Sequence, residues 1–447
     1  MDRRPMIPDD ITRYLTTIPD WAEIPTVDGL IGDLETLAAS NGDLCRWRRY
    51  GTSRLGDPLR VLSIGHGERN VLILGGPHAN EPFGALTVSH LSRLVTEHAE
   101  LRDDLTWHFL PWANPDAARM NEGWFAGPRS IRDYHEYLYR PAPVDDVDYT
   151  FPNLSENGYY DRPLPETQAV MRILEDLRPV FQYSLHNCDF GGVFYLLDHD
   201  VPGLAEDLLA FTGQSAVPLA MDSVVVTGLD SPGKGVYLFP PAELIDGGIA
   251  ELGGTSGHWA ARYGTTTLVA EIPMWNDPRA ADETDSGRTL GEVFGQAATE
   301  VAESSDLLAD LMATVRPALR SGSPLTASVE SLARLGPSLA QGMRAAAEAM
   351  DERPAAVGEA FVGAITPIMI RMRGLGQLRR LLRAELATGN HAPALRATVR
   401  KADELFDRAC HAAGTVSEGN PFPLRDVVAV QVGAGLVALR RILQEAE

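Results

Sequence analysis

The chain has 447 residues, of which 44% are hydrophobic and 22% charged, values that are ordinary for a globular protein with an apolar core. Its formal net charge of -22 disfavours nucleic acid and anionic membranes as partners, and no apolar run is long enough to cross a bilayer. The three cysteines have no paired spacing, and the N-terminus lacks the apolar segment of a secretory signal. We therefore expect a cytoplasmic protein without disulfides.

Short helices broken by proline and glycine are expected over residues 1–40. Beyond them, apolar segments of strand length alternate with helical patterns at residues 85–95 and 166–177, as is typical of an α/β sheet covered on both faces. The turn-rich segment 65–70 separates the first two strands and indicates a hairpin or neighbouring strands. The predicted strands span residues 59–64, 71–74, 106–111, 180–185, 193–197 and 267–272.

The pattern changes after Trp275. A polar, acidic loop is expected at residues 276–287, and from Arg288 onward only helical patterns follow, separated by breaks rich in glycine and proline. The last helix is apolar nearly all round, which predicts that it is buried. We expect an N-terminal helical segment (1–40), an α/β domain (41–287) and an all-helical C-terminal region (288–447) through which the chain could form oligomers. The predicted C-terminal helices span about residues 288–314, 325–351, 354–386, 391–414 and 424–446.

Three residues that follow strands indicate a metal site. His78 and Glu81 lie three positions apart after an apolar strand, and His186 follows a later strand. Imidazole and carboxylate are ordinary zinc ligands, and the carboxyl ends of strands are where open α/β sheets bind ligands. Other interpretations are a helix-capping carboxylate beside a surface histidine, and, for His186, a core histidine bonded to the backbone.

Glu271 ends another predicted strand. A carboxylate there would be costly to bury without a partner. A metal ion, a water molecule or an arginine would offset that cost, and so would a structural salt bridge. The ligand set of His78, Glu81 and His186 predicts one zinc ion per chain, and Glu271 is a candidate to lie beside it.

Together these residues resemble the zinc carboxypeptidases, the carboxypeptidase A-like metallopeptidases, over about residues 55–275. That family has a His-x-x-Glu pair, a third ligand histidine further along the chain and a catalytic glutamate near the end of the domain. Asn114-Pro115-Asp116 resembles the family's Asn-Pro-Asp-Gly segment. The resemblance implies a mixed, mostly parallel eight-stranded sheet between helices.

The resemblance also implies roles for individual side chains. Arg119, in an Arg-x-Asn motif, would polarise the scissile carbonyl and stabilise the oxyanion. Asp148 would hold His78 in the correct tautomer. Glu271 would act as general base toward the water that the zinc ion activates. The predicted activity is hydrolysis of an amide or peptide bond by a metallocarboxypeptidase-like protease.

One departure from the family concerns the substrate. The Asn-Arg pair that grips a C-terminal carboxylate is replaced by Thr150 and Phe151. Either Arg140 takes over this role, or the enzyme no longer requires the carboxylate. The loss favours a second interpretation, an N-acyl amino-acid deacylase resembling the aspartoacylase branch of the fold, and a third is a catalytically silent scaffold. The expected substrate is a peptide or an acylated amino acid, and the candidate contacts are Asn114, Arg140 and Thr150.

Overall fold

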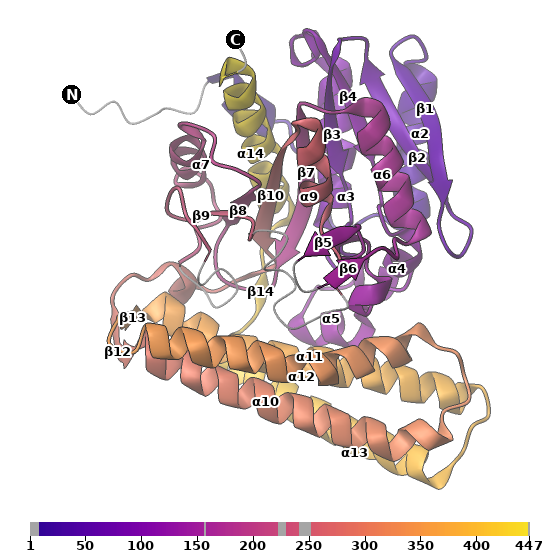
Figure 1. Ribbon diagram of the computed structural model, residues 1–447, viewed down its shortest axis with the longest axis vertical. Coiled ribbons are helices and arrows are strands. Elements are labelled where there is room, and N and C mark those ends of the chain that lie inside the picture. Colours follow the sequence, from indigo (N-terminus) through magenta and orange to yellow (C-terminus); the bar gives the residue numbers. More distant parts are fainter. Residues whose placement is uncertain (1–8, 156–157, 222–228, 241–251, 446–447) are drawn as a thin grey trace.

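The computed structural model describes residues 9–155, 158–221, 229–240 and 252–445 (Figure 1). Its centre is an eight-stranded sheet in which the neighbouring pairs β4-β3, β3-β7, β7-β10 and β8-β9 are parallel and the others antiparallel. The expected mixed, mostly parallel eight-stranded sheet is confirmed. In sheet order the strands are β1 (Cys45–Thr52), β2 (Pro58–Gly65), β4 (Leu105–Leu110), β3 (Arg69–Leu74), β7 (Phe181–Cys188), β10 (Thr266–Pro273), β8 (Phe194–Leu197) and β9 (Val236–Leu238).

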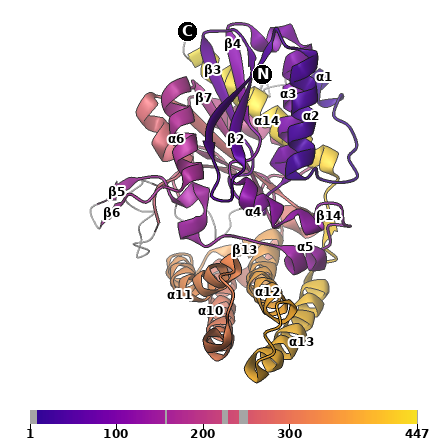
Figure 2. The same ribbon diagram turned by 90° about the vertical axis from the view of Figure 1, so that its right-hand side faces the viewer.

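Helices cover both faces of the sheet (Figure 2). α6 (Pro165–Leu177) and α9 (Ser256–Ala260) cover one face, and a larger group covers the other. The central helix of that group is α3 (Phe83–Glu97). Its side chains are buried almost all round, because it lies between the sheet and the outer helices. The group consists of α1 (Asp9–Leu15), α2 (Val27–Ser40), α3 (Phe83–Glu97), α7 (Leu204–Thr212) and α14 (Leu424–Glu445).

The pairing of β2 and β3 differs from the prediction. They form neither a hairpin nor adjacent strands, because β4 lies between them, antiparallel to β2 and parallel to β3. Segment 65–70 therefore connects two strands that are separated by a third. The edge strand β1 was not predicted, since its sequence CRWRRYGT carries three arginines and shows no apolar run.

The helical C-terminal region is confirmed, and four of its helices lie together across one end of the sheet (Figure 1). They are α10 (Leu290–Val315), α11 (Pro324–Ala349), α12 (Val357–Ala387) and α13 (Pro393–Val416). Short strand pairs join this region to the rest of the chain: β11 (Trp275–Asn276) with β14 (Asn420–Pro421), and β12 (Asp285–Thr289) with β13 (Pro354–Ala356).

The last helix, α14, returns to the sheet. The hydroxyl of Tyr183 in β7 donates to the carbonyl oxygen of Gln431, and the Gln431 side chain donates to the carbonyl oxygen of His186 at 3.0 Å. The predicted burial of this helix is confirmed by its buried apolar residues from Val427 to Ile442. Within the described ranges, the structure contains no helix with the length and apolarity needed to cross a bilayer.

Candidate metal and catalytic site

A tight turn at the end of β3 begins the site. Gly76 has φ +56°, and a Cβ there would lie 2.4 Å from the ring of Trp112. At Gly75 a Cβ would lie 2.4 Å from the carbonyl oxygen of Pro111. Only glycine allows this close approach and this backbone conformation. The turn carries the chain from the end of β3 into the loop that holds His78 and Glu81, directly before α3.

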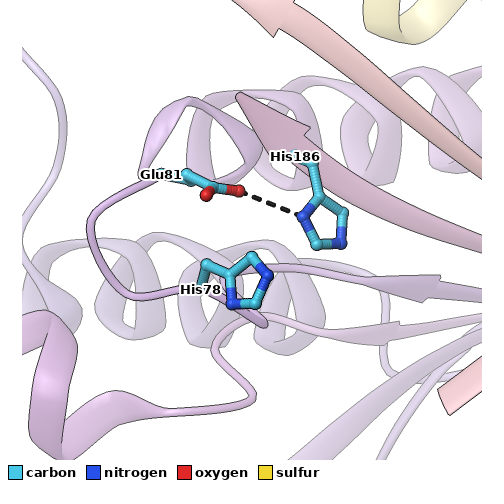
Figure 3. Close-up of side chains that lie close together, drawn as sticks. All are labelled: His78, Glu81 and His186. Carbon is cyan, nitrogen blue, oxygen red and sulfur yellow. Dashed lines mark hydrogen bonds and ion pairs between the residues drawn. The ribbon is translucent and has the colours of Figure 1, made fainter. Parts of the chain in front are cut away.

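The structure brings together the three predicted metal ligands. His78, Glu81 and His186 are 7%, 6% and 3% exposed, and one potential ligand atom from each lies within 4.8 Å of the others. Their side chains converge from the loop after β3 and from β7 (Figure 3). Nδ1 of His186 lies 3.0 Å from Oε2 of Glu81. Two imidazoles and one carboxylate in this arrangement fit a zinc ion and leave room in a tetrahedral shell for a further ligand.

Glu271 lies beside this ligand set because of the sheet register. It pairs with His186 on the adjacent parallel strand, so both side chains project from the same face of the sheet. Oε1 of Glu271 lies 3.8 Å from Nδ1 of His186, and its side chain is 17% exposed. This carboxylate is therefore adjacent to the ligands and partly open to solvent.

Burial and neighbouring charges shift the pKa values of Glu81, His186 and Glu271. Burial favours neutral Glu81, but His78, His186 and Arg140 outweigh burial and lower the pKa of Glu81 well below its ordinary value. Burial opposes protonation of His186, yet the hydrogen bond and charge of Glu81 raise the pKa of His186 to about 9. Burial, with the charge of Glu81 added, raises the pKa of Glu271 to about 8. A cation at this position would displace protons from the cluster.

The partner of His78 differs from the prediction. Nδ1 of His78 lies 3.2 Å from Oδ2 of Asp146, which is 1% exposed. Asp148 instead accepts a hydrogen bond from the backbone of Ser256, and its other oxygen lies 3.8 Å from Nε2 of His186. The prediction that Asp148 holds His78 is therefore wrong. The 3-10 turn Val147–Tyr149 directs the two aspartates to different histidines.

The arginine in contact with the ligand set also differs. The Arg119 guanidinium is held by Asp28 and Asp57, at 2.7 and 2.8 Å. Arg140 donates from Nη1 to Oε1 of Glu81 at 2.9 Å, and its Nε lies 3.4 Å from Oδ2 of Asp146. The positive charge beside the predicted ligands is thus that of Arg140 and not that of Arg119.

Two further predicted substrate contacts, Thr150 and Asn114, make hydrogen bonds within the protein. The hydroxyl of Thr150 is fully buried, 2.6 Å from that of Thr167 and 3.0 Å from the carbonyl oxygen of Asp146. Asn114 is also fully buried, and its side chain caps α4 (Pro115–Arg119) by accepting from the backbone of Ala117. Both side chains are closed to solvent and bonded to nearby backbone, so their contact with substrate stays a prediction.

Asn187, which follows His186, was not predicted to belong to the site. Its backbone N–H donates to Oε2 of Glu81 at 3.2 Å, and its side-chain oxygen accepts from the backbone of Phe83 at 3.2 Å. The first turn of α3 has no capping side chain of its own, so Asn187 supplies the acceptor from another strand. The only signal in the sequence was its position next to a predicted ligand.

Residues 31–136 match the family described as zinc carboxypeptidase, so the predicted resemblance to that family is confirmed over this segment. The matched segment includes His78 and Glu81. No curated protein sequence matches the chain. Among solved structures, carboxypeptidase A from Helicoverpa armigera is 14% identical, with 76% of this chain and 80% of that chain covered and a TM-score of 0.40. Bovine thrombin-activatable fibrinolysis inhibitor, in complex with tick carboxypeptidase inhibitor, is 14% identical, with 57% and 87% covered and a TM-score of 0.37.

Proposed function

We propose that this chain is a zinc-dependent hydrolase of amide or peptide bonds. The observation that carries the proposal is the convergence of His78, Glu81 and His186 on one point with Glu271 in register beside them. The match of residues 31–136 to the zinc carboxypeptidases supports the same chemistry. The test is zinc content together with hydrolysis of a panel of peptides and acylated amino acids, with the broken bond identified for each. Two results would count against the proposed activity. One is hydrolysis by protein that contains no zinc, and the other is zinc-loaded protein that hydrolyses no substrate of the panel.

The proposed mechanism assigns one task to each side chain. When bound, a zinc ion supplies Lewis-acid activation of water and of the scissile carbonyl. Glu271 accepts a proton from the attacking water and returns it to the leaving nitrogen. Arg140 supplies positive charge toward the oxyanion, in place of Arg119. Asp146 holds His78 in one tautomer through Nδ1.

A second candidate is an N-acyl amino-acid deacylase. It is favoured by the absence of the Asn-Arg pair, whose positions are taken by Thr150 and Phe151. Both side chains are buried, 0% and 1% exposed, so neither replaces a carboxylate clamp at this position. Preferential cleavage of acylated amino acids over peptides in the same panel would select this activity.

We expect the site to make little distinction between a free and an amidated C-terminus. The guanidinium of Arg140 is already engaged by Glu81 and Asp146 and is therefore not an open clamp. A charge-assisted hydrogen bond contributes about 1.5–3 kcal/mol, so an ordinary clamp would give a preference of at least about tenfold. The measurement is kcat/KM for a matched pair of free-acid and amidated peptides.

Arg140→Ala serves as the second arm of this comparison. If Arg140 acts on the oxyanion, the variant should lower kcat/KM for both peptides to the same degree. A loss confined to the free acid would make Arg140 the clamp. A strong free-acid preference that persists in Arg140→Ala would exclude Arg140 as the clamp, contradict the expected small distinction between the two C-termini and point to another arginine.

A further inference from the structure

The helical C-terminal region contacts Arg140 through the backbone of this arginine. The N–H of Arg140 donates to Oε1 of Gln377 in α12 at 2.9 Å. The hydroxyl of Ser328 in α11 lies 2.5 Å from the carbonyl oxygen of Arg140 and 2.7 Å from the same oxygen of Gln377. Both backbone polar groups of Arg140 are thus met by side chains from α11 and α12.

These contacts are buried. Gln377 is 0% exposed and Ser328 is 1% exposed. A buried polar side chain is costly unless it is hydrogen-bonded, and so is a buried backbone N–H. Within the described part of the chain, Nε2 of Gln377 has no partner. The hydrogen bonds of the Gln377 side chain are therefore made by its oxygen, which accepts from Arg140 and Ser328.

The neighbouring residue fixes the position of α12. A Cβ at Gly376 would lie 1.9 Å from the carbonyl oxygen of His135 in α5 (Ile131–Tyr137), so the helix backbone packs directly against this segment. Nearby, Arg380 donates to the carbonyl oxygen of Met120 at 3.0 Å. The close packing prevents α12 from sliding and keeps Gln377 opposite Arg140.

The contacts continue from Arg140 into the ligand set. Its guanidinium meets Glu81 at 2.9 Å and Asp146 at 3.4 Å, and Asp146 in turn contacts His78 at 3.2 Å. Groups that orient metal ligands affect metal binding although they do not touch the metal. A continuous path of hydrogen bonds and ion pairs therefore leads from α11 and α12 to two predicted ligands, and it passes through Arg140.

We propose that Gln377, assisted by Ser328, is a positioning residue for Arg140, and that the helical C-terminal region thereby completes the metal site. The proposal rests on the proposed function in one respect, that Glu81 and His78 hold zinc. It assigns to α11 and α12 a role in the site itself, in addition to packing.

The first test is the zinc affinity of metal-free protein, measured by competition with a chelator. Gln377→Leu keeps the volume and removes the acceptor, and we expect it to weaken zinc binding about tenfold, as loss of an outer-shell partner does. Arg140→Ala should have a similar effect. If Gln377 acts through Arg140, the double variant should bind zinc no more weakly than Arg140→Ala alone, since the two effects are not independent. Additive losses would overturn the proposal.

Asn390→Ala is the matched control. Asn390 is 1% exposed and lies in the turn between α12 and α13, where its side chain donates to Glu385 at 2.6 Å and to the carbonyl oxygen of Ala318 at 2.7 Å. Its loss disturbs α12 and the segment before α11 without touching Arg140. The control should leave zinc affinity within about twofold of the wild type, and an equal loss in the control would show a general effect of helix packing and overturn the proposal.

A crystal structure of Gln377→Leu gives a readout that is independent of zinc. We expect the Arg140 guanidinium to leave Glu81 in this variant, and an unchanged contact would overturn the proposal. Ser328→Ala, a smaller change, keeps the test available if Gln377→Leu does not fold, with the same displacement expected. Wild-type protein that binds no zinc would refute the proposed function. The contact between Arg140 and Glu81 in the crystal structure of Gln377→Leu would still decide whether Gln377 positions Arg140.

Discussion

Glu271→Gln is expected to retain zinc and to lower kcat by about 10²–10⁴-fold, the range that general acid–base catalysis contributes. The amide has nearly the same shape as the carboxylate but cannot accept the proton of the attacking water. Glu271 lies beside His186, at 3.8 Å, and is not a member of the group of three whose ligand atoms converge. The measurement is kcat and zinc content of the same preparation.

Glu283→Gln is a suitable control for this variant, because Glu283 is an exposed residue paired with Lys234. The control should keep both zinc and activity. Loss of zinc in Glu271→Gln would show that Glu271 is a metal ligand rather than the base. Full activity with zinc bound would remove Glu271 from the mechanism.

His186→Ala should lose both zinc and activity. The substitution removes one of three ligand side chains and leaves His78 and Glu81, and two ligands do not make the tetrahedral sites in which proteins hold zinc. We expect zinc content to fall from one ion per chain to less than about a tenth of that value. The carbonyl oxygen of His186, which accepts from Gln431, is retained in the variant, so α14 keeps this contact with β7.

His108→Ala is the matched control for His186→Ala. His108 is also a buried histidine on a strand of the sheet, 4% exposed, but it is bonded to Ser63 and Asn70 rather than to the ligand set. It should keep zinc. Elemental analysis and circular dichroism on both variants separate metal loss from unfolding, and a folded His186→Ala protein with full zinc would exclude His186 as a ligand.

The fold could be predicted where local signals were strong. The strands β3 and β10 contain buried apolar runs, β7 is buried and carries apolar residues at alternate positions, and α14 carries an apolar pattern nearly all round, so the sequence was enough to place them. The position of β4 between β2 and β3 could not be predicted, since pairing depends on contacts distant in sequence. The edge strand β1 was not predicted, because its three arginines interrupt the alternation of apolar and polar residues that indicates a strand.

The same division applies to the site. The ligand candidates follow strands and have side chains typical of metal sites, which local sequence shows. The choice between Asp146 and Asp148 depends on a single 3-10 turn, and their sequence positions differ by two. The choice between Arg140 and Arg119 depends on Asp28 and Asp57, which hold Arg119 from distant parts of the chain. Such choices are made by tertiary packing and could not be read from motif spacing.

The central claim is that one zinc ion lies between His78, Glu81 and His186. The most direct measurement is anomalous diffraction from crystals of the zinc-loaded protein, recorded on both sides of the zinc absorption edge. We expect one strong peak, at about 2.0–2.2 Å from a nitrogen of each histidine and from an oxygen of Glu81. Zinc-loaded crystals with no peak between these three side chains, or with their strongest peak elsewhere, would contradict the claim.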